Sequence, residues 1–140
     1  IDLGEIENDE ILEASGIASS RFNQNILWTH NDSGDENRIF AMDINGNHVG
    51  EFFLNNVKNR DWEDIAIGPG PIEGVDYIFV GDIGDNRSEN DIKHIYRFAE
   101  PQVYTDNQSS EINIDNIESI SYQYEDGNRD ADSFIVDPIT

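Results

Sequence analysis

Cysteine is absent from this chain of 140 residues. Neither a disulfide framework nor a thiolate metal site is therefore available, so stability must come from core packing, to which bound ions could add. Long apolar runs are absent as well. No stretch approaches the roughly 20 residues that cross a bilayer, and no signal peptide of basic and then apolar residues is present. We expect no membrane span.

Basic residues are scarce: 8 Lys and Arg stand against 30 Asp and Glu, which gives a net charge of −22. Such a charge repels nucleic-acid phosphates and anionic lipids, so we expect no nucleic-acid partner and favour cations and basic partners. Asp, Glu and Asn crowd the turns, while Ile, Phe, Tyr and Val fill short runs between them. This pattern is typical of a folded chain, and residues 1–140 are long enough for one domain with its own core.

Two stretches of the chain share a spacing of 50 residues. An acid, an apolar residue and a turn recur without a gap in the pairs Glu13 and Glu63, Ile17 and Ile67, Asp32 and Asp82, and Asp35 and Asp85. Each stretch contains four short runs with the alternation and turn residues of β-strands. Helical periodicity over three turns appears nowhere. The spacing predicts an internal repeat of one supersecondary unit.

We predict four strands in each copy. They are 15–21, 25–31, 38–44 and 48–54 in the first copy (about 13–54), and 64–68, 76–82, 92–98 and 117–124 in the second (about 63–124), with a polar insertion at 101–116. A period of about 40 to 50 residues with four strands is typical of a propeller blade. The expected fold class is all-β, a β-propeller-like array of about two four-stranded antiparallel blades with flanking strands.

Two blades do not close a propeller, which usually has about 4 to 8 of them. The expected flanking strands are 2–7 and 132–137, and the second of these begins a third copy at 130–140. Two explanations are open. The start at Ile1 without Met suggests a processed protein or a fragment, and the reading that we favour is a fragment of a longer chain. Alternatively, neighbouring copies complete the unpaired edges by strand addition, which gives an oligomer or a fibre.

Acidic and amide side chains recur before the innermost strands and in the turns after the second strands. In a four-stranded meander these places lie at the same end, so we expect the side chains to share one face. Calcium prefers six to eight carboxylate, amide and backbone oxygens, and crowded carboxylates without a cation cost stability. The predicted Ca²⁺ ligands are Glu13, Asn31, Asp32, Asp35, Asp61, Glu63, Asp64, Asp82, Asp85, Asn86, Asp130 and Asp132.

Another reading is open for the repeated Asp-x-Gly-Asp motif. It is also an ordinary turn, in which Asp caps backbone amides and Gly supplies a positive φ. The motif lacks the Glu at the twelfth position and the flanking helices of an EF-hand. Magnesium fits less well because it keeps its waters, and zinc prefers His or Cys, whereas the three histidines are scattered.

Other polar and aromatic residues have two interpretations each. His30, beside Asn31 and Asp32, is the candidate general base of a hydrolase, although a structural hydrogen-bonding role is the stronger reading. Trp62, between Asp61 and Glu63, is a candidate exposed contact, whereas the other aromatic residues are expected in the core. Three Asn-x-Ser sequons are candidate glycosylation sites in a secreted protein: Asn31, Asn86 and Asn107.

Several segments together resemble a family of uncharacterised secreted bacterial β-propeller proteins, over their N-terminal half. The segments are Glu13-Ala-Ser-Gly-Ile17, residues 28–34, residues 61–66, residues 81–86, Ile95-Tyr-Arg97 and residues 130–134. The resemblance implies a propeller fold and secretion. More distantly, the arrangement is similar to six-bladed calcium propellers of the paraoxonase and gluconolactonase type, in which axial acids and amides hold calcium near the substrate; fold likeness alone does not transfer function.

The expected function is an extracellular or cell-surface, calcium-binding propeller-type module for binding or for surface or fibre assembly. The alternative is a calcium-dependent hydrolase of esters, lactones or phosphoesters, in which the ion polarises the substrate and His30 or an axial Asp moves the proton.

Overall fold

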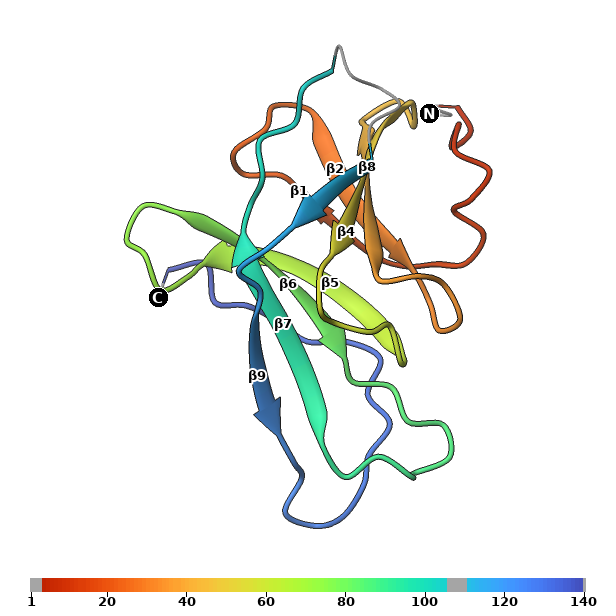
Figure 1. Ribbon diagram of the computed structural model, residues 1–140, viewed down its shortest axis with the longest axis vertical. Coiled ribbons are helices and arrows are strands. Elements are labelled where there is room, and N and C mark those ends of the chain that lie inside the picture. Colours follow the sequence, from red (N-terminus) through yellow and green to blue (C-terminus); the bar gives the residue numbers. More distant parts are fainter. Residues whose placement is uncertain (1–3, 106–110, 140) are drawn as a thin grey trace.

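The computed structural model describes residues 4–105 and 111–139. Within these ranges the fold is all-β, with nine strands in two sheets and no helix (Figure 1). The strands are β1 (Ala14–Ser19), β2 (Ile26–Asn31), β3 (Arg38–Asp43), β4 (His48–Leu54), β5 (Trp62–Pro69), β6 (Asp76–Asp82), β7 (Lys93–Ala99), β8 (Glu111–Ile114) and β9 (Glu118–Tyr122). In the described part of the chain, no helix is long and apolar enough to traverse a bilayer.

The predicted strand pattern is confirmed for eight strands. Four consecutive strands in antiparallel order, β1-β2-β3-β4, form most of the first sheet, and β5-β6-β7-β9 form the second. The pairing of Ala14 with Asn31 in the first sheet matches that of Asp64 with Gly81 in the second. The β2–β3 and β6–β7 loops therefore leave corresponding ends of the two sheets. No closed propeller is formed by these strands.

Strand β8 differs from the prediction of a polar insertion at 101–116. It pairs in parallel with β4, with Phe52 opposite Ile112 and Leu54 opposite Ile114, and makes the first sheet five-stranded. Ile114 is buried in the core. After β8 the chain crosses to the second sheet, where β9 pairs with β7 (Figure 1). Strands β8 and β9, which follow each other closely in the chain, therefore connect the two sheets.

The predicted flanking strands are wrong for the residues described. Residues 4–7 form no strand, and positions 2 and 3 lie outside the described residues. Residues 132–137 also form no strand; they join neither sheet and instead pack against the second sheet through side chains. Phe134 packs on Gly81, Val136 packs on Gly68, and the Phe134 amide donates to the Asp64 carboxylate.

One core joins the two sheets. It includes Trp28, Phe52 and Leu54 from the first sheet and Trp62 and Phe98 from the second, all almost fully buried. The expectation that Trp62 is an exposed contact is therefore wrong. Its ring lies 6.1 Å from the His30 ring in a T-shaped arrangement and 6.4 Å from the tilted Tyr96 ring, and its indole nitrogen donates to the Lys58 carbonyl.

Close contact between β1 and β5 brings the sheets together. A Cβ on Gly16 would lie 2.7 Å from the backbone nitrogen of Ile65, so only glycine permits this approach. The Ser15 hydroxyl donates to the Glu63 carbonyl at 2.9 Å. The start of β5, which carries the acids of the predicted ion site, is held against the first sheet in this way.

Candidate metal centre

Five of the predicted calcium ligands meet at one place, and we call them the acid cluster: Asp32, Asp61, Glu63, Asp130 and Asp132. They form two triads, Asp32–Asp61–Glu63 and Glu63–Asp130–Asp132, each with one carboxylate oxygen per residue within 4.8 Å of the others. Oxygens that surround one calcium ion at 2.3–2.6 Å lie no more than about 5 Å apart. The spacing in each triad therefore suits a calcium ion, and Glu63 belongs to both.

Three separate segments supply the acid cluster. Asp32 follows β2, Asp61 and Glu63 flank Trp62 at the start of β5, and the other two acids lie in the C-terminal segment. Two of these acids are fixed through their backbone amides: the Asp32 amide donates to the Glu13 carbonyl at 2.9 Å, and the Asp61 amide donates to the Asp82 carboxylate at 3.0 Å. The cluster therefore lies where the first sheet, the second sheet and residues 130–132 meet.

Gly84 forms the floor of the acid cluster. A Cβ at this position would overlap carboxylate atoms of both Glu63 and Asp61, and the Gly84 amide donates to the Asp61 carbonyl at 3.2 Å. The bare backbone in the β6–β7 loop leaves the space that the two carboxylates occupy. A larger residue would displace them.

Crowding changes the proton affinity of the acid cluster. Burial, and then the charges of Asp32 and the other cluster acids, raise the pKa of Glu63 to about 7. Burial, followed by the charges of Asp32 and Asp130, raises the pKa of Asp61. These carboxylates repel each other when ionised, and a divalent cation between them would remove that repulsion.

Two predicted ligands support the acid cluster from behind. Asp82 is almost fully buried; its carboxylate accepts the Asp61 amide, pairs with Arg60 at 3.3 Å and accepts from Tyr96 at 3.4 Å. Asp64 accepts the amides of Ile65 and Phe134 at 2.8 and 3.1 Å. Both carboxylates bind protein donors, so they position the backbone of the cluster.

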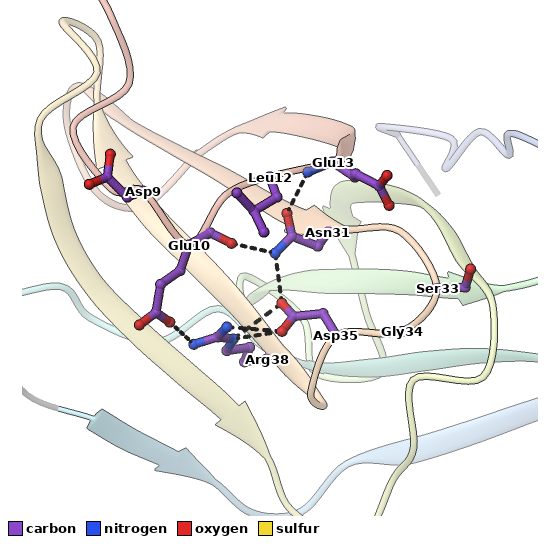
Figure 2. Close-up of a pocket in the computed structure, with 9 residues that line it drawn as sticks. All are labelled: Asp9, Glu10, Leu12, Glu13, Asn31, Ser33, Gly34, Asp35 and Arg38. Atoms are coloured by element: carbon purple, nitrogen blue, oxygen red, sulfur yellow. Dashed lines mark hydrogen bonds and ion pairs between the residues drawn. The ribbon is translucent and has the colours of Figure 1, made fainter.

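Asn31 and Asp35 belong to another network, shown in Figure 2. The Asn31 side chain accepts the Glu13 amide and donates to the Glu10 carbonyl and to Asp35. Asp35 binds Arg38 at 2.9 Å. Although burial acts to raise the pKa of Asp35, hydrogen bonds from Arg38 and Asn31 hold it below its usual value. These bonds fix the β2–β3 loop.

The residues of this network, together with others such as Leu12, line a pocket of about 550 Å³ (Figure 2). Besides Asp35, Arg38 binds Glu10 and Glu51 and lies 4.9 Å from the ring centre of Phe40. Its guanidinium is thus enclosed by three carboxylates and a ring. The pocket shares no residue with the acid cluster.

Asp85, in the second Asp-x-Gly-Asp motif, forms a buried ion pair with Lys93. Its carboxylate lies 2.8 Å from the Lys93 ammonium, both side chains are enclosed, and it also accepts the amides of Glu89 and Asn90. Burial acts to raise the pKa of Asp85, but these donors outweigh it and lower the pKa to about 2. The motif is thus a turn whose Asp caps amides, as the alternative reading of the sequence has it. The Asp85 amide in turn donates to Asp130 at 2.7 Å.

The remaining candidates lie outside the acid cluster. Glu13 and Asn86 are exposed and belong to neither triad. His30 has no exposed surface; its Nδ1 lies 2.8 Å from the Asn31 carbonyl, and burial lowers its pKa. Of the sequons, Asn31 is buried, Asn86 is exposed and Asn107 lies outside the described residues.

Sequence reasoning missed three residues that build the site: Gly84, Ser15 and Lys93. Gly84 carries no chemistry, and its role depends on how closely the loop approaches β5. Lys93 is the one lysine close after Asp85, and this spacing is a signal that the sequence contains. Comparisons of the chain with protein-family models, with curated proteins and with solved structures found no match.

Proposed function

We propose that the acid cluster binds a divalent cation, calcium, and that the ion fastens residues 130–132 to the junction of the two sheets. The observation that carries this proposal is the convergence of five carboxylates from three segments, with Glu63 common to both triads. Carboxylates brought this close are stable together only when protons or cations offset their charge.

The ligand chemistry favours calcium over other common cations. The triads contain carboxylates only, whereas zinc sites in proteins usually include His or Cys. Magnesium keeps several waters and uses few protein ligands, while calcium accepts many oxygens in irregular geometry. Exposure of Asp130 and Asp132 leaves room for water in the remaining positions.

The biological setting that we propose is an extracellular or cell-surface module of the β-propeller type. Extracellular calcium modules work with dissociation constants of roughly 10⁻⁴ to 10⁻³ M. The four-strand antiparallel order common to both sheets supports the propeller part of the proposal. The hydrolase alternative has less support, since His30, its expected base, is enclosed in the core.

Self-assembly by strand addition is the second part of the proposed function. Strand β9 lies at the edge of its sheet, and four of its five residues are exposed. An edge strand offers unpaired backbone donors and acceptors to a strand from another chain.

A thermal melt with and without chelator tests the cation site. We expect the chelator to lower Tm by about 10 °C, since an ion at a hundredfold excess over Kd stabilises the fold by about 2.7 kcal/mol. Asp61→Asn should remove most of this difference. Asp126→Asn, in an exposed pair with Arg129, is the matched control and should keep it. Equal melting temperatures with and without chelator for the wild-type chain would refute the proposal.

A further inference from the structure

Beside the acid cluster lies a pocket of about 340 Å³, which we call the arginine pocket. Its wall includes Ser33, Arg60, Asp61, Asn86 and Arg87, and every lining side chain is polar or charged. Asp61 belongs to both the pocket and the acid cluster. A ligand in the pocket would therefore lie next to the proposed cation.

One arginine in this pocket, Arg87, is exceptional in an acidic chain because it has no acidic partner among the residues that the structure describes. Of the eight basic side chains, six form an ion pair with an acid; they are Arg21, Arg38, Arg60, Lys93, Arg97 and Arg129. The side chains of Lys58 and Arg87 make no hydrogen bond or ion pair with any residue that the structure describes. Of these two, only Arg87 lines the pocket. Its five N–H donors are available to a ligand.

Contacts with the protein hold Arg60 in place and leave two of its N–H donors unused. Its terminal nitrogens donate to the carbonyls of Ile92 and Asp82, both at 3.2 Å, and its Nε faces the Asp82 carboxylate at 3.3 Å. A guanidinium has five N–H groups, so one remains on each terminal nitrogen. About a third of the side chain is exposed. The guanidinium is thus oriented before any ligand arrives, which lowers the entropy cost of binding.

We propose that the arginine pocket binds an oxyanion, a carboxylate or a phosphate group of a ligand, between Arg60, Arg87 and the calcium at the acid cluster. Guanidinium groups bind both oxyanions through paired N–H donors, and calcium binds their oxygens. This inference rests on the proposed function. Without the cation, the carboxylates of Asp61 and Glu89 on the same wall repel an anion. Binding of the oxyanion therefore depends on calcium.

Calorimetric titration of the full chain at saturating calcium tests the inference. The probes are methyl phosphate and D-galacturonate, which distinguish the two oxyanions, and D-galactose, which lacks the carboxylate. We expect at least one oxyanion to bind, D-galactose not to bind, and chelator to abolish the binding. Arg87→Gln should weaken it at least tenfold, because a hydrogen-bonded charge is lost. Lys58→Gln, which removes the other unpaired cation, should leave it unchanged.

The outcomes separate this inference from the proposed function, because calcium binding is measured in the same samples. If calcium binds and neither oxyanion does, the arginine pocket is overturned and the calcium site stands. The same holds if D-galactose binds as well as D-galacturonate, or if Arg87→Gln and Lys58→Gln behave alike. If calcium itself does not bind, the proposed function fails and this inference fails with it.

Discussion

Glu63 is the residue on which the two triads depend, and its ionisation has a direct effect on stability. Its pKa in the folded chain is about 7, above the ordinary value of 4.5. A carboxyl that holds its proton more tightly when folded stabilises the fold below the unfolded pKa, and this contribution is lost as the pH rises through the folded pKa. Without calcium, the ionised Glu63 therefore destabilises the chain above pH 7.

A comparison of Glu63→Gln with wild type in chelator tests this effect. Relative to wild type, the glutamine variant should gain stability between pH 4.5 and pH 7, because it cannot ionise. Urea unfolding at several pH values gives the free-energy difference. With calcium present the order should reverse at pH 8, since the ion binds the carboxylate. A difference that does not change with pH would show that the acid cluster does not raise the pKa of Glu63.

Of the twelve predicted ligands, five form the acid cluster and seven lie outside it. The sequence predicted where the acids lie along the strands, but it did not separate the five that converge from the seven that lie elsewhere. Asp35 binds Arg38, and Asp85 binds Lys93. In both cases a basic residue close in the sequence indicated that the Asp would form an ion pair. Contacts such as Asp64 with Phe134 join positions 70 residues apart, and no local pattern predicts them.

The eight predicted strands could be recognised from local sequence alone, because the apolar alternation and the turn residues of each strand lie within or beside its own run. Strand β8 is different. It has four residues, lies in a polar segment, and pairs with β4 some 60 positions earlier in the sequence. The extended segment at 132–137 was predicted as a strand because it repeats the β5 pattern. Its packing against β5 and β6 takes the place of ladder pairing.

Strands β8 and β9 each carry an isoleucine that allows a matched test. Ile114 is 9% exposed and belongs to the shared core, whereas Ile120 is 39% exposed. We expect Ile114→Ala to destabilise the chain by about 2 kcal/mol or more, and Ile120→Ala by less than about 1 kcal/mol. Chemical denaturation measures both values. Equal losses would mean that β8 does not contribute to the core.

For the whole molecule, the net charge of −22 opposes the proposed self-assembly. Salt shortens the range of this repulsion from about 30 Å at 0.01 M to about 8 Å at 0.15 M. We therefore expect light scattering to report a mass above the 15.9 kDa of one chain at the higher salt concentration. Ile120→Lys, which adds a charge to the edge strand, should keep the mass near that of one chain. A monomer at every salt concentration would contradict strand addition.

Calcium titration by calorimetry tests the central claim most directly. We predict saturable binding to the wild-type chain with Kd of about 10⁻⁴ to 10⁻³ M, as in other extracellular modules. Glu63→Gln should weaken binding at least tenfold because both triads lose a ligand, whereas Glu125→Gln, at an exposed position outside them, should not change it. No saturable heat, or the same Kd for wild type and Glu63→Gln, would contradict a calcium site at the acid cluster.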